Sequence, residues 1–238
     1  MLTHQQHMNV IGNNMANIST AGYKQDTYTA TTFDDVMYAR VGNKDGVGVP
    51  IGRQSYIRAA SRVYTDHGQG TLEPTSLPLD FAINGEGFFA VNAQGGRVYT
   101  RMGNFSLDEE SYLCLPGFGR VLDVNGREIQ MYTDKIYGDS TGKIYYEDGD
   151  QLIAQLGVFN TGDPEALEHT QQGFFTGNDM RLVEAPNVLN GYLERSNTDI
   201  VKQMTDMISV QRALQSAAQI SKMYDQLMTR AVTDIGRM

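Results

Sequence analysis

The sequence predicts an α+β protein in which a central antiparallel β-rich domain is flanked by N- and C-terminal helices that pair as a coiled-coil stalk. Two observations support this fold class. Apolar residues recur every seven positions near both ends of the chain, and glycine and proline divide the long middle into short apolar or alternating runs. With 238 residues, 40% of them hydrophobic, the chain can bury a sizeable core in one or two domains.

The N-terminal segment has the heptad spacing of a helix that packs against a partner. Met8 and Met15 lie seven residues apart, and Ile11 and Ile18 each follow one of them after three residues. These are the a and d positions of a coiled-coil seam. Gly22 is a typical helix terminator and predicts the end of this helix.

The C-terminal segment has a longer pattern of the same kind. Its apolar a and d positions are Val210, Ala213, Ala217, Ile220, Tyr224, Leu227 and Ala231. No Pro or Gly occurs from Glu194 to Ile235, which predicts a helix of roughly 35 residues and about 50 Å. Ser196, with Asp199 three residues later, resembles a capping box at its start. A helix of this length needs a partner helix to bury its seam.

Residues 29–191 are expected to form the β-rich outer domain, and residues 1–28 with 192–238 the helical polymerisation domain. Strand-like runs in the middle are separated by turn residues, as at 81–83, 87–91, 97–100, 120–122, 143–146 and 152–159. Asn125-Gly126 predicts a two-residue hairpin turn, since both residues tolerate a positive φ. The stretch from Asp139 to Gly142 separates two further strands.

Composition excludes several classes of function. The net charge of −9 leaves no surplus of Lys and Arg to neutralise a phosphate backbone, so no nucleic-acid partner is expected. Cys114 is the only cysteine, so no intrachain disulfide and no cysteine-based zinc site can form. The sequence has no apolar run of about 18 residues and no typical secretory signal, so neither membrane insertion nor a cleaved signal peptide is expected.

The sequence predicts no catalytic, cofactor-binding or metal site. His4 and His7 share a helix face, but no Asp, Glu or Cys accompanies them, so a solvated or interfacial role is expected. Asp108, Glu109 and Glu110 resemble a solvated turn rather than a pair of catalytic carboxylates. The glycines at 85–87 and 117–119 open no helix of a βαβ unit and predict no phosphate cradle.

Three separated segments resemble the bacterial flagellar basal-body rod and hook axial protein family. The first runs from Ile11 to Lys24 and contains an Asn-Asn-x-Ala-Asn core followed by Thr-x-Gly-Tyr-Lys. The second comprises 78–91 and 99–108, and the third begins at Leu193 and extends through Ala213. The resemblance covers most of the chain in the family's order, and we call these parts the signature segments.

The resemblance implies a structural subunit of the flagellar basal-body rod, proximal or distal, that polymerises helically through its terminal helices to form the axial drive shaft needed for motility. It also implies export by the flagellar type III apparatus, residence in the basal body of the cell envelope, and contacts with other copies and with neighbouring rod and hook proteins. No cofactor is implied.

The expected assembly interface combines both apolar seams with the neutral amides of the first signature segment, which can hydrogen-bond between subunits without the desolvation cost of charges. The alternative is that these amides only cap the helix before Gly22. The interface residues are Met8, Ile11, Asn13, Asn14, Met15, Asn17, Ile18, Val210, Ala213, Ala217, Ile220, Tyr224, Leu227 and Ala231.

Other functions stay open at this point. One is a hook-type subunit of the same family. A second, of a different class, is a β-sheet enzyme that its terminal helices merely oligomerise. A third is a secreted coiled-coil stalk protein, for which a signal peptide would be expected.

Overall fold

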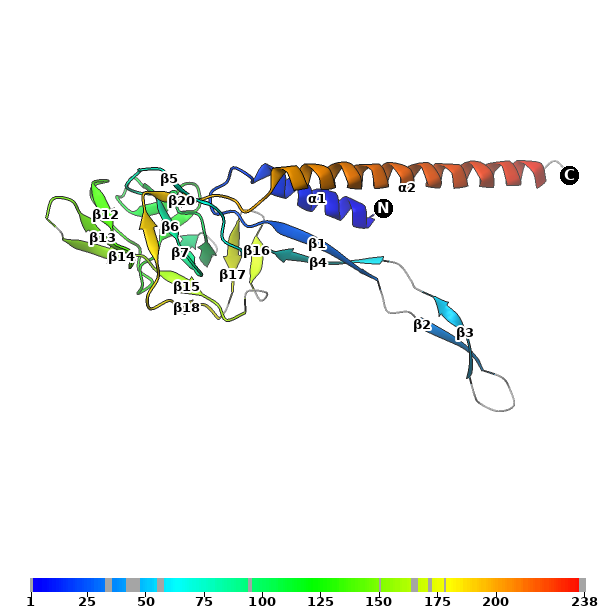
Figure 1. Cartoon of the computed structure of the whole chain (residues 1–238), viewed down its shortest axis with the longest axis horizontal. Helices are drawn as coiled ribbons and strands as arrows, with labels where there is room; N and C mark the ends of the chain where they lie inside the picture. Colours follow the sequence, from blue (N-terminus) through cyan, green and yellow to red (C-terminus); the bar gives the residue numbers. More distant parts are fainter. Residues whose placement is uncertain are drawn as a thin grey trace. The chain divides into compact units, whose positions relative to one another are not determined.

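The computed structural model describes residues 2–32, 36–41, 48–54, 58–93, 96–149, 151–163, 167–170, 173–177 and 179–235. The chain forms two compact units: unit 1 comprises Met1–Gly12, Asp26–Tyr64 and Val201–Met238, and unit 2 comprises Asn13–Gln25 and Thr65–Ile200. A helix near each end and a β-rich body confirm the α+β class (Figure 1). Unit 2 contains residues 13–25 and 192–200, which the sequence pattern groups with the terminal helices.

Helix α1 is Leu2–Ala16, and helix α2 is Ile200–Ile235, the orange-to-red helix of Figure 1. The turns that follow α1 lead to Gly22, which has a φ of +67°. The expected cap at Ser196 is wrong, because the Ser196 hydroxyl is hydrogen-bonded to the Thr198 hydroxyl (2.9 Å) and backbone N–H (3.2 Å) and α2 begins after them. The absence of Pro and Gly explains why α2 continues for 36 residues.

Unit 1 contains strand pairs as well as helical segments, and the β2–β3 pair is antiparallel. β1 (Asp26–Thr32) pairs with β4 (Arg58–Thr65), and β2 (Val36–Val41) pairs with β3 (Gly48–Gln54). We call these four strands the ribbon. The ring of Tyr28 on β1 stacks on His7 of α1, with centroids 5.3 Å apart. Because two-stranded pairs are marginally stable alone in water, the ribbon depends on such packing.

The strands of unit 2 are short, as expected from the glycine and proline residues that punctuate this part of the chain. They are β5 (Leu72–Pro74), β6 (Phe81–Ile83), β7 (Phe88–Ala93), β8 (Gly96–Thr100), β9 (Ser106–Leu107), β10 (Leu113–Leu115), β11 (Gly119–Val121), β12 (Ile136–Gly138), β13 (Lys143–Tyr146), β14 (Leu152–Gln155), β15 (Val158–Asn160), β16 (Glu168–Thr170), β17 (Phe174–Thr176), β18 (Arg181–Leu182), β19 (Val188–Asn190) and β20 (Tyr192–Glu194).

Among these described strands, nine form one antiparallel sheet in the order β16-β17-β8-β7-β11-β10-β9, with β15 paired to both β7 and β18. β12, β13 and β14 form a separate antiparallel sheet. The last strands of unit 2 return to its first, because β19 pairs with β6 and β20 pairs with β5. Segments that begin and end unit 2 in sequence are therefore neighbours in space.

Strand β7 supplies side chains to two hydrophobic clusters. Alternate residues of a strand point to opposite faces of the sheet. Phe89, with no exposed surface, belongs to the larger cluster, whereas Phe88 and Ala90 belong to the smaller one. The other buried members of the larger cluster are Phe81, Ile83, Met102, Phe105, Leu113, Leu115, Val121, Ile129, Met131, Ile136, Ile144, Leu156, Val158, Phe174 and Val188.

A turn lies at Asn125-Gly126, but the prediction of a two-residue hairpin loop is wrong, because the residues bridged across it are Leu122 and Glu128. Only Gly126 has a positive φ, of +77°. The Asp123 carboxylate accepts hydrogen bonds from the N–H groups of Asn125 and Arg127, each at 2.8 Å, and Gly126 N–H donates to the Asp123 carbonyl. These bonds close a longer loop with glycine in the left-handed position.

Candidate assembly interface

The second half of α2 exposes an apolar stripe. Its side chains recur every three or four residues, which places them on one side of the helix. They are 53–68% exposed, and we call them the exposed stripe: Ile220, Met223, Tyr224, Leu227, Met228 and Val232. The opposite side carries polar residues, among them Lys222, Gln226 and Thr229. An apolar face of this kind on a long helix is suited to packing against another chain.

The first half of α2 has a buried side instead. Gln203 and Val210 are 3% and 7% exposed, and Ala213, Leu214 and Ala217 are partly buried. Of the interface residues predicted on this helix, Val210, Ala213 and Ala217 therefore lie on the covered half, whereas Ile220, Tyr224, Leu227 and Ala231 lie on the exposed half.

The interface residues predicted in the N-terminal segment differ in exposure. Ile11 is buried at 2%, and Met8, Met15, Asn17 and Ile18 are partly buried. Their role in assembly, like the pairing of α1 with α2 as a coiled coil, stays a prediction.

The three asparagines of the first signature segment have distinct environments. Asn14 is 1% exposed, and its Oδ1 accepts a hydrogen bond from the Tyr23 hydroxyl at 3.2 Å. Asn13 is exposed, and its carbonyl accepts from the side-chain amide of Asn17 at 2.9 Å. Asn17 Oδ1 also accepts from the Thr20 hydroxyl. These amides shape the end of α1 and the turn that follows it, and their role between subunits stays a prediction.

A buried ion cluster joins the signature segments inside unit 2. Lys24 Nζ lies 2.6 Å from Glu194 Oε1, and Arg101 Nη1 lies 3.2 Å from Glu194 Oε2. The three side chains are at most 4% exposed. We call Lys24, Arg101 and Glu194 the Glu194 cluster. Each comes from a different signature segment, so sequence segments far apart meet at one carboxylate.

Backbone groups add three further hydrogen bonds to the Glu194 cluster. Glu194 Oε1 also accepts from Gly70 N–H at 2.8 Å, while Lys24 Nζ donates to the Gly68 carbonyl at 2.8 Å. Arg101 Nη2 donates to the Gly85 carbonyl at 2.7 Å. Buried charges need such partners, because an ion removed from water without them is strongly destabilising.

Burial also changes the acidity of the two cations. Desolvation lowers the pKa of Lys24 and that of Arg101 below their ordinary values, because a buried environment disfavours the charged forms. The nearby Glu194 carboxylate acts in the opposite direction on both. The guanidinium of Arg101 lies over the Phe88 ring, 5.3 Å from its centroid, which adds a cation–π contact.

Two glycines allow the backbone to approach the Glu194 cluster closely. Gly22 N–H donates to the Glu194 carbonyl at 2.7 Å. A Cβ at Gly22 would lie 2.3 Å from the carbonyl carbon of Arg101, and one at Gly70 would lie 2.0 Å from the carbonyl oxygen of Arg195. Sequence reasoning did not pick out Lys24, Arg101 or Glu194 as a site, although all three lie in the signature segments.

Three of the points where the chain passes between the units are hydrogen-bonded together within unit 2. Gln25 N–H donates to Asn197 Oδ1 at 2.7 Å, and Asp66 N–H donates to the Gln25 carbonyl at 2.8 Å. The Asn197 side-chain amide donates to the carbonyls of Asp66 and Gly68. Within unit 2, these hydrogen bonds hold together the segments that precede the ribbon, follow the ribbon and precede α2.

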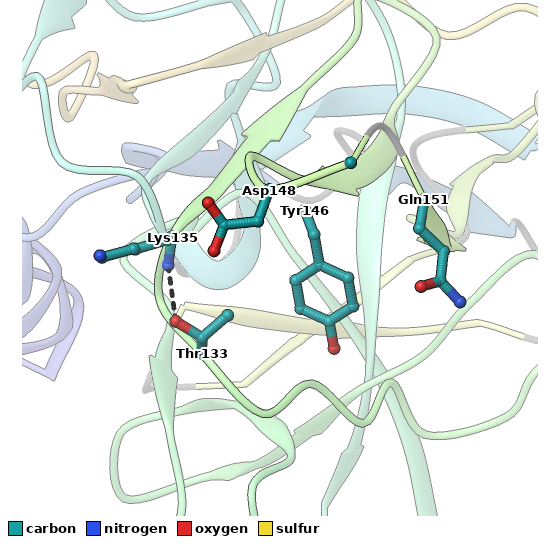
Figure 2. A pocket seen from close by; sticks show the side chains of 6 residues that line it. Thr133, Lys135, Tyr146, Asp148 and Gln151 are labelled. Atoms are coloured by element: carbon teal, nitrogen blue, oxygen red, sulfur yellow. Dashed lines mark hydrogen bonds between the residues drawn. The ribbon is translucent and has the colours of Figure 1, made fainter.

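Two cavities of unit 2 are polar or mixed in character. One, of about 240 Å³, lies at one end of the β12–β14 sheet, where Figure 2 shows Thr133, Lys135, Asp148 and Gln151 around Tyr146. The dashed bond joins Lys135 N–H to Thr133 Oγ1 at 3.2 Å. The other, of about 330 Å³, is lined by Ile18, Ser19, Ala21, Glu73, Thr75, Leu193, Glu194, Arg195 and Ser196.

Within the described ranges, no three His, Cys, Asp or Glu side chains come together in a way that would hold a metal ion. Neither described helix carries an apolar stretch long enough to cross a lipid bilayer.

Comparison with known proteins gives a consistent result. A family model described as "Flagella basal body rod protein" matches residues 1–24, and one described as "Flagellar basal body rod FlgEFG protein C-terminal" matches residues 189–234. Among similar proteins, the flagellar basal-body rod protein FlgG of Bacillus subtilis is 29% identical over 98% of this chain and 94% of its own length. FlgG of Caulobacter vibrioides is 29% identical over 96% and 93%, and FlgF of Mesorhizobium japonicum is 27% identical over 98% and 92%.

The chain has a β-rich body flanked in sequence by two terminal helices, and the matched family is structural rather than enzymatic. The chain belongs to the flagellar basal-body rod protein family. It is a structural subunit of the basal-body rod. The similar proteins reported above are rod proteins, which does not favour the alternatives of a hook-type subunit or an oligomerised enzyme.

Proposed function

We propose that this subunit polymerises helically through its terminal helices, with α1 and α2 pairing as a coiled coil and the exposed stripe of α2 packing against other copies. The observation that carries the proposal is the stripe itself, six apolar side chains left 53–68% exposed. An extended apolar face gains free energy only when another surface covers it. The predicted interface residues Ile220, Tyr224 and Leu227 are part of this face.

Magnitudes favour a polymer over a simple pair of subunits. Covering the exposed part of each stripe side chain gains roughly 1–2 kcal/mol. The sum is of the same order as the cost of about 4–15 kcal/mol for bringing two chains together. A single contact is therefore marginal, whereas a helical polymer gives each copy several neighbours. The neighbours would be other copies and the adjoining rod and hook proteins.

We further propose that the chain reaches the basal body through the flagellar type III export apparatus, without removal of a signal peptide. The resemblance of its signature segments to exported axial proteins supports this route. In a strain that lacks the export apparatus but makes the chain, it should accumulate in the cytoplasm. Its appearance outside the inner membrane of that strain would contradict the proposal.

The assembly proposal is tested by deleting the gene in its host. We expect cells without hook or filament but with normal growth, because later subunits would have no surface on which to polymerise. Full-length protein should restore swimming, and protein ending at residue 217 should not, because it lacks the exposed stripe. A deletion strain that swims normally, in a host without a second copy, would refute the proposal.

A further inference from the structure

The strands that complete unit 2 come late in its sequence. β19 and β20 pair with β6 and β5, which lie near its start. Between these pairs, Asn84 N–H donates to the Asn187 carbonyl at 2.7 Å, and Gly191 N–H donates to the Asp80 carbonyl at 2.8 Å. Without residues 187–194, β5 and β6 lose the strands with which they pair.

The charges of the Glu194 cluster also make the early part of unit 2 dependent on a residue near its end. Two cations, Lys24 and Arg101, share one carboxylate, and all three side chains are almost fully buried. The positive charge of Arg101 acts on Lys24 in the same direction as burial and lowers its pKa. Burying both cations before Glu194 arrives would leave two like charges without the carboxylate that both of them contact, which is strongly unfavourable. The buried arrangement therefore requires a residue from the end of unit 2.

We propose that Glu194 completes the folding of unit 2. In a chain that emerges N-terminus first, unit 2 would stay open until residues 187–194 have emerged. It would then close in one cooperative step together with the turn that carries Lys24 and the segment that carries Arg101. Because α2 begins only at Ile200, the exposed stripe would become available after the groups that close unit 2. The inference rests on contacts inside unit 2 and does not depend on the proposed polymer.

The loss of Glu194 would have a different effect on hydrogen exchange if its contacts were purely local than if they complete the folding of unit 2. If Glu194 only tethered β20, its loss would loosen the residues around it and leave the rest of unit 2 protected. If it completes the unit, its loss should loosen segments that are distant in sequence to the same extent. Amide hydrogen exchange separates these cases, because it reports the opening of each segment.

The test compares two variants of the full chain. Glu194→Gln keeps the shape and the hydrogen-bond acceptor but removes the charge. We expect exchange at residues 20–25, 68–70 and 81–83 to accelerate together by about 100-fold or more, equivalent to about 3 kcal/mol at 1.4 kcal/mol per tenfold. The control Glu73→Gln removes a carboxylate from the neighbouring strand, in an exposed pair with Arg195 at 2.7 Å. We expect the Glu73→Gln variant to exchange its amides at wild-type rates. If exchange in Glu194→Gln accelerates only at residues 192–196, the proposal is overturned.

A second variant keeps the test decisive if Glu194→Gln does not fold. The triple variant Lys24→Met, Arg101→Met, Glu194→Met replaces every charge of the cluster by an apolar side chain. Such replacements of buried ion groups are often neutral or stabilising. We expect the amide exchange rates of this variant to lie within about tenfold of the wild-type rates, which corresponds to about 1.4 kcal/mol. A triple variant as unprotected as Glu194→Gln would show that the unpaired charges are not the cause and would overturn the proposal.

The order of closure can be followed in the wild-type chain. In refolding with pulsed hydrogen exchange, amides of β5 and β6 should become protected in the same phase as those of β19 and β20. Protection of β5 and β6 in an earlier phase would overturn late completion.

Discussion

Lys24 and Glu194 are 170 positions apart in the chain, yet Lys24 Nζ and Glu194 Oε1 are 2.6 Å apart and both side chains are at most 1% exposed. The pair fixes the segment after α1 to the segment before α2 within unit 2. The backbone of Glu194 makes a second contact with the segment after α1, because the Gly22 N–H donates to the Glu194 carbonyl. The first and last signature segments thus serve the internal structure of the subunit.

Gly22→Ala should destabilise unit 2. Gly22 has a φ of +67°, and an added Cβ would lie 2.3 Å and 2.4 Å from the carbonyl carbon and oxygen of Arg101. Backbone atoms cannot move aside as a flexible side chain can, so we expect the free energy of unfolding to fall by roughly 2–4 kcal/mol. Urea denaturation measures the change. Gly12→Ala is the control, because its Cβ would meet nothing within 4 Å and alanine favours a helix by about 1 kcal/mol over glycine. Equal destabilisation by both variants would contradict this explanation.

Ile220→Asp or Leu227→Asp should abolish rod assembly and swimming while unit 2 keeps its stability. A carboxylate placed in the seam would be buried without a partner, at a cost of several kcal/mol. Electron microscopy of basal bodies and swimming in soft agar report assembly, and thermal unfolding of the purified chain reports stability. Gln226→Asp introduces the same charge on the opposite side of α2 and should assemble normally. Motile cells carrying Leu227→Asp would show that this stripe is not a contact in the polymer.

Limited digestion of the isolated chain with trypsin should cut α2 first. Lys222 and Arg230 are exposed in the half of the helix that has no buried side, and such a segment opens easily. Lys24 and Arg101 are 1% and 4% exposed and should resist cleavage until unit 2 unfolds. Mass spectrometry of the early fragments identifies the sites. Early cleavage after Lys24, with α2 intact, would contradict the described burial.

Acid should weaken unit 2 through the carboxylates around Arg120. The pKa of Asp108 lies below its ordinary value of 3.8, chiefly because Tyr112 N–H donates to it and also because Arg120 does. The pKa of Glu128 lies below 4.5, chiefly through Asn92 and then Arg120. Between the ordinary and the lowered pKa values of these carboxyl groups, the unfolded chain binds more protons than the folded one. The contribution of the two carboxylates to the free energy of unfolding is therefore complete above about pH 5, and it is lost as the pH falls through the lowered pKa values.

The measurement for this effect is urea denaturation between pH 7 and pH 3. We expect Asp108→Asn to be less stable than wild type at pH 7 and to lose less stability on acidification. Glu109→Gln, which changes the exposed carboxyl next in the chain, is the charge-matched control. If the wild type and Asp108→Asn lose stability equally on acidification, Asp108 does not contribute as described.

Local features were predictable from the sequence because each depends on nearby residues. Heptad spacing and the absence of Pro and Gly predicted α2, and glycine punctuation predicted short strands. The stretch from Asp139 to Gly142 does separate β12 from β13, with Gly142 N–H donating to the Asp139 carbonyl at 2.9 Å. The turn at Gly126 was placed correctly but given the wrong type, because the Asp123 side chain reorganises the loop.

The Glu194 cluster was not predictable in the same way. Contacts between residues more than a hundred positions apart leave no periodic trace in the sequence, and Lys24, Arg101 and Glu194 individually read as surface charges. The resemblance to the rod family placed each in a signature segment but did not indicate that they meet. The division of the chain into units depends on such contacts, whereas the coiled-coil pairing of the terminal helices stays a prediction.

The segments of unit 2 that precede and follow the ribbon lie side by side, because Asp66 N–H donates to the Gln25 carbonyl at 2.8 Å. A chain excursion with joined ends is modular: its length can change without changing the fold from which it departs. Evolution or an engineer could lengthen the ribbon, replace it by a short linker or exchange it for a reporter peptide. Unit 2 would need no redesign, whereas within unit 1 such a change would have to preserve or replace the stacking of Tyr28 on His7.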